Sequence, residues 1–211
     1  MKRKIGSALI FLGMALILCA AGLLIRNERQ DADAGRAAQQ ILPELMQQIE
    51  ERHEQRAESP DPVLDILPGT PPELIDPALF QMTEVEIDGY GYVGYLSIPA
   101  LELELPVMGQ WDYDRLKIAP CRYNGSVLGE DLVIMAHNYN RHFGRLKDLS
   151  EGDRVVFMDM DGRVTYYQVA ALDVLMPQAV DEMTAGLYDL TLFTCTYGGQ
   201  SRVTVYCNQE E

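Results

Sequence analysis

Three residues at the ends of predicted strands could together carry out acyl transfer. Cys195 ends an apolar, β-branched run at 188–194, and Arg202 begins a second such run after a glycine-containing loop. The two runs predict a hairpin, which would place a thiol beside a fixed cation and so favour the nucleophilic thiolate. His137 directly follows another apolar run, at 131–136. Strand ends often meet at one rim, so the sequence predicts a site built from these three residues.

The chemical types of these residues match the steps of acyl transfer. A cysteine thiolate attacks a carbonyl carbon, and Arg202 would stabilise the negative charge that develops on the oxygen. His137 would protonate the departing amine and later deprotonate the incoming one. Thr194 could add a further donor, and together with Leu192 and Tyr197 it forms the predicted substrate-binding set.

Each of these residues also has a purely structural interpretation. A lone cysteine is more often a buried structural thiol, and an arginine at a sheet edge can serve to prevent aggregation. His142 lies five residues after His137 in a polar stretch, which predicts a loop position and makes it the alternative base. The remaining histidine, His53, lies in a highly charged segment and is expected to face solvent.

The other cysteines and the acidic turns give weaker signals. Cys19 lies in an apolar run, and spacing does not establish a disulfide between Cys121 and Cys207, so that pairing stays open. Residues 159–162 begin like a calcium-binding loop but lack its third acidic ligand and its later glutamate, so a turn is expected. We therefore predict no cofactor, and an effect of Ca²⁺ on activity has only weak support.

The first 26 residues predict a membrane anchor. Residues 5–25 carry no charge and as a helix would span roughly 31 Å, enough for a bilayer core. Lys2, Arg3 and Lys4 precede this run, which predicts that the N-terminus is inside and the rest of the chain outside. A cleaved signal peptide is the alternative, but the run is longer than the usual apolar signal core of about 7–15 residues.

The rest of the chain divides into a spacer, 27–86, and a domain, 87–211. The spacer is acidic and its second half is rich in proline, which predicts an extended, solvated segment. Its first half has Ile41 and Leu45 at helical spacing, with Pro43 near the start of the expected helix. The domain has about eight short strands and few helices, which indicates a mainly β barrel or sandwich. A net charge of −15 argues against nucleic acid as a partner.

These residues and their surroundings resemble the sortase family, the cysteine transpeptidases of bacterial cell surfaces. The resemblance rests on residues 191–195 (Thr-Leu-Phe-Thr-Cys) followed by Arg202, and on 131–137, which ends in the histidine. It extends to 94–99 (Gly-Tyr-Leu-Ser-Ile-Pro) and 143–148 (Phe-Gly-Arg-Leu-Lys-Asp), and so covers the whole predicted domain.

The resemblance implies an eight-stranded sortase-type β-barrel with short helices. It also implies cleavage of a sorting signal similar to Leu-Pro-x-Thr-Gly in secreted proteins, with a thioacyl intermediate on Cys195, His137 as acid and base, and Arg202 holding the substrate or the oxyanion. The acyl group would pass to an amine of a peptidoglycan precursor or of a pilin lysine, outside the membrane of a Gram-positive-type bacterium. Ala136, where many sortases have glycine, is a departure that leaves these roles standing. The sequence indicates the subclass only weakly, as class B or class D.

Two other functions would use the same residues differently or not at all. A hydrolytic cysteine peptidase would use water in place of the amine, and product formation that requires the amine would exclude it. A non-catalytic, membrane-tethered barrel could bind a wall component, and this function predicts that Cys195 is buried and unreactive.

Overall fold

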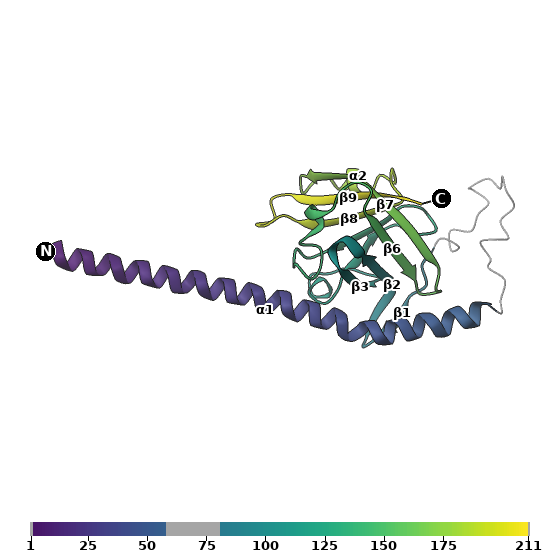
Figure 1. Cartoon of the computed structure of the whole chain (residues 1–211), viewed down its shortest axis with the longest axis horizontal. Helices are drawn as coiled ribbons and strands as arrows, with labels where there is room; N and C mark the ends of the chain where they lie inside the picture. Colours follow the sequence, from purple (N-terminus) through teal and green to yellow (C-terminus); the bar gives the residue numbers. More distant parts are fainter. Residues whose placement is uncertain (1, 58–80, 211) are drawn as a thin grey trace.

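The computed structural model describes residues 2–57 and 81–210, and nine strands within them give a mainly β fold (Figure 1). The strands are β1 (Val85–Ile87), β2 (Tyr90–Ile98), β3 (Leu103–Met108), β4 (Cys121–Asn124), β5 (Leu132–Ala136), β6 (Arg154–Asp159), β7 (Val164–Leu175), β8 (Leu190–Cys195) and β9 (Arg202–Gln209). Neighbouring strands follow the order β2-β3-β4-β5-β8-β9-β7-β6, and pairing of β6 with β2 closes the ring. The predicted eight-stranded barrel is therefore confirmed, and β1 is an additional strand on β2.

Short helical turns lie between the strands of the barrel. They are η3 (Pro99–Leu101), η4 (Arg115–Lys117), η5 (Leu146–Asp148) and α2 (Val180–Met183). The alternating pattern at 101–105 predicts a strand over all five residues, but β3 begins only at Leu103. Leu101 belongs to η3 instead, and Glu102 adopts a left-handed backbone with a φ of 53° that ends this turn.

Strands β5, β8 and β9 lie side by side and end or begin at the predicted site. β5 and β8 run parallel with Ala136 opposite Thr194, while β8 and β9 run antiparallel with Cys195 opposite Arg202. Because side chains alternate between the two faces of a strand, one set points into the barrel and the other points outward. The inward set of these strands is buried in the main core and consists of Leu132, Ile134, Ala136, Leu190, Leu192, Val205 and Cys207.

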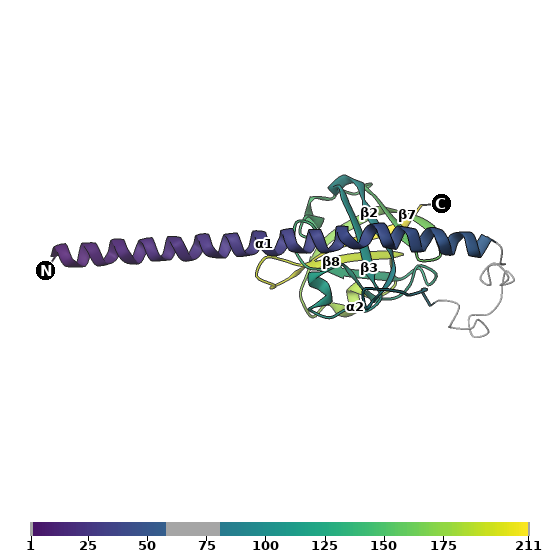
Figure 2. The same cartoon turned by 90° about the horizontal axis from the view of Figure 1, so that it is seen from below.

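Helix α1 (Lys2–Ala57) is much longer than the sequence predicts, because it passes through Pro43 without a break instead of starting near it. Its second half lies across β1, β2 and β3 (Figure 2). Apolar and small side chains at helical spacing form the buried stripe of this half: Ala34, Ala38, Ile41, Leu45 and Ile49. The first half of the predicted spacer is therefore docked on the barrel rather than solvated. Residues 58–80, the proline-rich part of the predicted spacer, lie outside the described residues.

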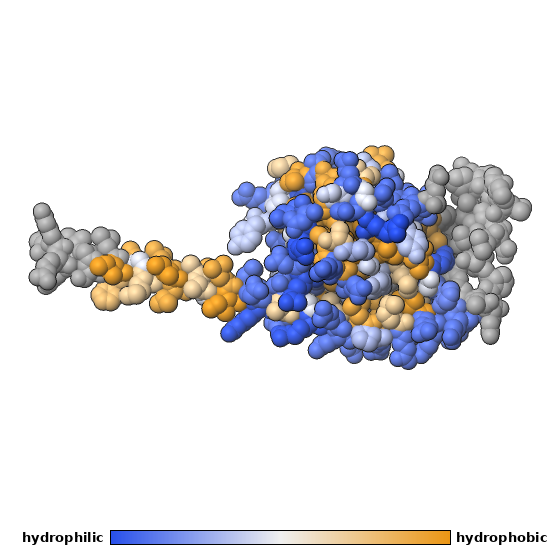
Figure 3. Space-filling model, in the orientation of Figure 1, coloured by the Kyte–Doolittle hydropathy of each residue, from blue (hydrophilic) through white to orange (hydrophobic). Residues whose placement is uncertain are grey.

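The first half of α1 extends away from the barrel and exposes apolar side chains (Figure 3). Phe11 and Leu24 are each 70% exposed, and their apolar neighbours along the helix are similar. This helix is long and apolar enough to cross a membrane. Contiguous exposed apolar surface of this kind is unfavourable in water and favourable in lipid. The structure is thus consistent with the predicted single-pass anchor.

Candidate active site

The three predicted catalytic residues lie at one rim of the barrel. Cys195 is the last residue of β8, and Arg202, its partner in register, is the first residue of β9. His137 directly follows β5, whose last residue pairs with Thr194 of β8. Neighbouring strands lie about 4.8 Å apart, so the three backbones are close together. Within the described residues no hydrogen bond joins the three side chains, and such contacts often tighten only when substrate is bound.

Cys195 differs from the other two cysteines of the barrel in its exposure. Its side chain is half-buried on the outward face of β8, whereas Cys121 and Cys207 are fully buried. Burial raises the pKa of both buried thiols to about 12, because the thiolate would lose its hydration. All three thiols are free, so the Cys121–Cys207 disulfide is not formed. Cys195 is therefore the barrel thiol that a substrate could reach.

His137, the predicted base, has a lowered pKa. Its imidazole is half-buried, and this burial, followed by the positive charge of Lys117, lowers its pKa from the ordinary value of 6.5. At neutral pH the ring is therefore uncharged and able to accept a proton. The ring of Tyr139 packs beside it with a centroid separation of 5.1 Å. The carbonyl oxygen of His137 also accepts a hydrogen bond from the backbone N–H of Phe143, at 3.2 Å.

The guanidinium of Arg202 is held by the loop between β8 and β9. Its Nη1 donates to the carbonyl oxygens of Gly199 and Ser201, both at 3.1 Å. The same loop is closed by a bond from the backbone N–H of Thr196 to the carbonyl oxygen of Ser201, at 2.9 Å. Gly199 adopts a φ of +73°, a conformation that favours glycine. The guanidinium is therefore fixed on this loop, at the rim where Arg202 and Cys195 pair in register.

The three predicted substrate-binding residues are not brought together. Leu192 has no exposed surface and points into the barrel core. Thr194 is 3% exposed, and its Oγ1 donates to the carbonyl oxygen of Ala136 at 2.8 Å, so it ties β8 to β5. Tyr197 is 91% exposed in the loop after β8. The sequence could have shown that Leu192 points inward, because side chains alternate along a strand and Leu192, three residues from Cys195, must face the opposite way.

An aromatic surface beside Cys195 was not predicted from the sequence. Phe193 lies on the same outward face of β8 as Cys195 and packs edge-on against Tyr123, with ring centroids 5.3 Å apart. Tyr123 in turn packs against Trp111 at 5.7 Å, and Trp111 is 41% exposed. Met183 of α2 belongs to the same apolar cluster as Phe193. These side chains form an apolar floor on the face of β8 that carries Cys195; Phe193 and Met183 are almost fully buried, so its accessible part is Tyr123 and Trp111.

His142 lies in a loop, as the sequence predicts, but its side chain is buried, whereas its polar surroundings predict that it stays out of the core. It has no exposed surface and lies beside the ring of Tyr139, with centroids 5.6 Å apart. Burial lowers its pKa to about 4, and the backbone of Ala34 in α1 and of Ile118 lies close enough to oppose this shift. The prediction was wrong because helix α1 covers this loop, and no local pattern around His142 reveals that cover. His142 is thus buried away from substrate and unsuited to be the base.

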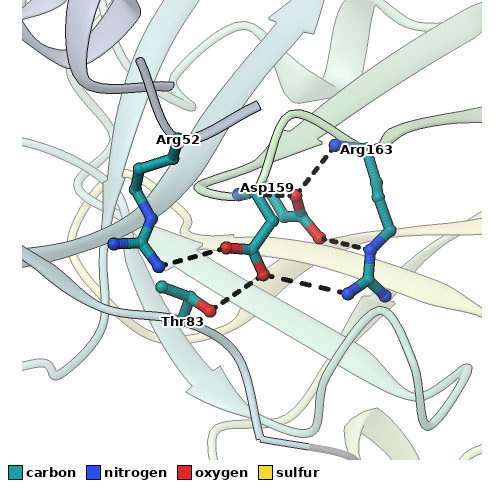
Figure 4. Close-up of polar contacts among 5 residues, drawn as sticks. Arg52, Thr83, Asp159 and Arg163 are labelled. Carbon is teal, nitrogen blue, oxygen red and sulfur yellow. Dashed lines mark hydrogen bonds and ion pairs between the residues drawn. The ribbon is translucent and has the colours of Figure 1, made fainter. Parts of the chain in front are cut away.

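The acidic segment at 159–162 is the turn of the hairpin between β6 and β7, as predicted. Asp159 Oδ1 accepts the backbone N–H groups of Asp161 and Arg163, both at 2.9 Å. Asp161 accepts from Thr83 at 2.9 Å and from Arg52 of α1 at 3.3 Å (Figure 4). These carboxylates are committed to hydrogen bonds within the protein. Among the described residues no group of three or more potential ligands gathers around a metal position.

Comparison with known proteins identifies the domain. The sequence model of the sortase domain matches residues 96–210, more than half of the chain. Sortase C1 from Streptococcus suis is 26% identical with a TM-score of 0.51, covering 57% of this chain and 73% of its own. Sortase C from Streptococcus pneumoniae is 21% identical with a TM-score of 0.55, covering 83% and 97%. Sortase A from Corynebacterium diphtheriae is 19% identical with a TM-score of 0.54, covering 91% and 95%. No curated protein matches significantly in sequence.

Proposed function

The chain belongs to the sortase family of cysteine transpeptidases, and from this premise we propose that it cleaves a sorting signal similar to Leu-Pro-x-Thr-Gly and transfers the acyl part to an amine. The observation that carries the proposal is the register of three neighbouring strands, which brings His137, Cys195 and Arg202 to one rim. The half-exposure of Cys195, compared with the two fully buried thiols, favours this function over that of a non-catalytic wall-binding barrel.

In the proposed first half-reaction, the sulfur of Cys195 attacks the carbonyl carbon of the scissile peptide bond. Neutral His137 takes the thiol proton and then gives it to the departing amine, so the C–N bond breaks and a thioester forms. Arg202 stabilises the oxyanion with guanidinium N–H groups other than those of Nη1, which bonds the loop carbonyls. In the second half-reaction an amine attacks the thioester carbon and His137 takes its proton. The C–N bond forms, the C–S bond breaks, and His137 returns the proton to the sulfur, which restores the Cys195 thiol.

The apolar floor beside Cys195 suits the apolar residues of a sorting signal. Tyr123 and Trp111 reach the surface of this floor, where a leucine or proline side chain could pack, and buried Phe193 supports Tyr123 from below. Thr194 supports this floor from beneath through its bond to Ala136. Tyr197, in the exposed loop, is the predicted substrate contact that stays accessible to a peptide.

The proposed location is the outer face of a cell membrane, with α1 as the anchor. The basic residues before the apolar run favour an inside N-terminus, which places the barrel outside with its secreted substrates. The proposed acceptor is an amine of a peptidoglycan precursor or of a pilin lysine. The structure of sortase C from Streptococcus pneumoniae was described with regard to pilin substrate specificity, which supports the second acceptor. The matched structures include both sortase C and sortase A, so assignment to class B or class D stays a prediction.

Covalent capture on the full chain in nanodiscs tests the proposal. Cys19 is first replaced by alanine, so that the three barrel cysteines are the thiols present. A charged methanethiosulfonate, or a sorting-signal peptide with and without an added amine, is then followed by mass spectrometry. We expect one adduct, on Cys195, and an amine-linked peptide that is lost in Cys195→Ala, His137→Ala and Arg202→Ala.

Two outcomes would contradict the proposal. Labelling of Cys121 or Cys207 with an unreactive Cys195 would favour the non-catalytic barrel. Peptide cleavage at the same rate with and without the amine, giving only the free acid, would identify a hydrolytic peptidase instead.

A further inference from the structure

Helix α1 binds the loop that follows His137, although α1 lies outside the matched sortase domain. The Oδ1 atom of Asp31 accepts the backbone N–H of Arg141 at 3.0 Å, and its Oδ2 lies 3.8 Å from Nε of the same residue. Asp31 is only 7% exposed. Burial of a carboxylate is costly unless it is hydrogen-bonded, so Asp31 is placed here by its contact with the loop.

Small residues on α1 allow this loop to approach closely. A Cβ at Gly35 would lie 2.2 Å from Cδ of Arg141, closer than two carbon atoms can come. Ala34 and Ala38 flank this position and are almost fully buried. The stem of Arg141 therefore lies directly on the helix surface, beside the carboxylate that holds its backbone.

The loop is a compact unit that passes from Arg141 back to His137. The backbone N–H of Phe143 donates to the carbonyl oxygen of His137 at 3.2 Å, and that of Gly144 donates to Tyr139 at 2.8 Å. Tyr139 packs against the imidazole of His137, and Phe143 is fully buried. A displacement of Arg141 would therefore be transmitted to the imidazole through both the backbone and the tyrosine ring.

We propose that Asp31 is a positioning residue for His137: it holds the backbone of Arg141 and so fixes the loop that orients the imidazole toward Cys195. This inference rests on the proposed function, because it assigns His137 the role of acid and base. It also implies that the catalytic unit includes the docked half of α1 and is larger than the barrel itself.

Point variants of the full chain in nanodiscs test the role of Asp31. Asp31→Ala removes the acceptor, and we expect kcat for the amine-linked product to fall about tenfold or more, because small misplacements of a catalytic group are costly. KM should stay within about twofold, since Asp31 is not among the residues proposed to contact substrate. Asp31→Asn keeps an oxygen that can accept the N–H of Arg141 and should retain most of the activity.

Asp33→Ala is the matched control. Asp33 lies on the same helix but is exposed and pairs with Arg36 of the same helix. We expect no change in kcat, in KM or in methanethiosulfonate labelling of Cys195. An Asp33→Ala effect as large as that of Asp31→Ala, or an unchanged kcat in Asp31→Ala, would overturn the inference.

Hydrogen exchange separates this inference from the proposed function. In Asp31→Ala the backbone amides of residues 138–144 should exchange faster, while those of β5 and β8 keep their protection. Unchanged exchange at 138–144 would overturn the inference even if the wild type were active. A wild type that forms no amine-linked product would refute the proposed function. Hydrogen exchange would still show whether Asp31 holds the loop at 138–144. If Asp31→Ala does not fold, Gly35→Leu serves instead, because it favours the helix while displacing Arg141.

Discussion

Helix α1 contacts the barrel through a charged residue at each end of its docked half. The two contacts differ in which loop of the barrel they hold. At the first, Asp31 holds the loop that follows His137. At the second, Arg52 donates to Asp161 in the turn between β6 and β7 (Figure 4). The first contact is at the loop that follows β5, beside the rim that carries Cys195, and the second is at the turn that joins β6 and β7 (Figure 1).

The comparison shows that similar bonds can have different functions. Both contacts join a side chain of α1 to a loop of the barrel, and both involve a carboxylate that is mostly buried. The turn at Asp161 supports no reactive group, so its contact with Arg52 contributes stability. The loop at Arg141 contacts His137 through Tyr139 and Phe143, so we propose that its contact with Asp31 contributes to the geometry of the site. Removal of the Asp31 contact should therefore lower activity, whereas removal of the Arg52 contact should lower stability.

The largest expected difference is between the two histidines near these ends. His137→Ala should lower kcat/KM for amine-linked product by about a thousandfold or more, because the acid and base is removed. His53→Ala is the matched control, since His53 is exposed and lies against Gly162 of the β6–β7 turn. Its rate should stay within about twofold of wild type. Steady-state kinetics measure both, and a similar loss in the two variants would contradict the comparison.

Acid should destabilise the loop that contains His142 but not the turn that contains Asp159. Burial lowers the pKa of His142 to about 4, so the unfolded chain binds more protons than the folded one between about 6.5 and 4. Stability should therefore fall as pH drops through this window, by up to about 3 kcal/mol. At the other end, burial raises the pKa of Asp159, which shifts stability in the opposite direction as pH falls.

Urea unfolding and hydrogen exchange at pH 7 and pH 5 measure this difference. We expect residues 138–144 to lose protection at pH 5 before residues 159–163 do. His142→Phe should flatten the pH dependence of the free energy of unfolding, while His53→Phe should leave it unchanged. Equal pH dependence in both variants would show that His142 is not the titrating group.

Removal of the second contact should cost stability alone. Arg52→Ala is expected to lower the free energy of unfolding by about 1 kcal/mol, because the contact is partly buried and Asp161 keeps its bond with Thr83. The value of kcat should not change. Arg36→Ala is the control, since Arg36 pairs only within α1 among the described residues. Urea unfolding measures the first effect, and a fall of kcat in Arg52→Ala would mean that both ends position the site.

The smallest expected effect is electrostatic and belongs to the rim. Lys117 lowers the pKa of His137 through its positive charge, as a lesser cause than burial. Lys117→Gln should therefore raise that pKa and move the acid limb of the pH–rate profile toward higher pH. The shift should be small and should shrink in high salt, because Lys117 is exposed. Lys147→Gln, also exposed, is the control, and an equal shift there would contradict a specific role for Lys117.

The rim could be predicted from the sequence because its signals are local. The apolar runs before His137 and Cys195 fix two strand ends, and the glycines after Cys195 predict the hairpin that returns at Arg202. The alternation of side chains along β8 also predicts that Leu192 faces the core, opposite to Cys195, and so argues against Leu192 as a substrate contact.

The docking of α1 could not be predicted, because its signals are not local. Asp31 and Arg141 are 110 residues apart, and each looks like an ordinary charged surface residue in sequence. The stripe that docks begins with Ala34 and Ala38, which are too small to mark an apolar face. The burial of His142 follows from the same cover and was missed for the same reason.

The unbroken course of α1 has a consequence for how this barrel meets other molecules. Asp31 lies five positions after Arg26, which follows the apolar run, and this corresponds to about 8 Å along the helix axis. No interruption of the helix separates these residues, so the barrel is not free to tumble as it would be on a flexible tether. With the apolar half in a bilayer, the rim that carries Cys195 keeps a fixed height and orientation relative to the lipid surface. Partners carried by the same bilayer then reach it by lateral diffusion in two dimensions rather than by a three-dimensional search.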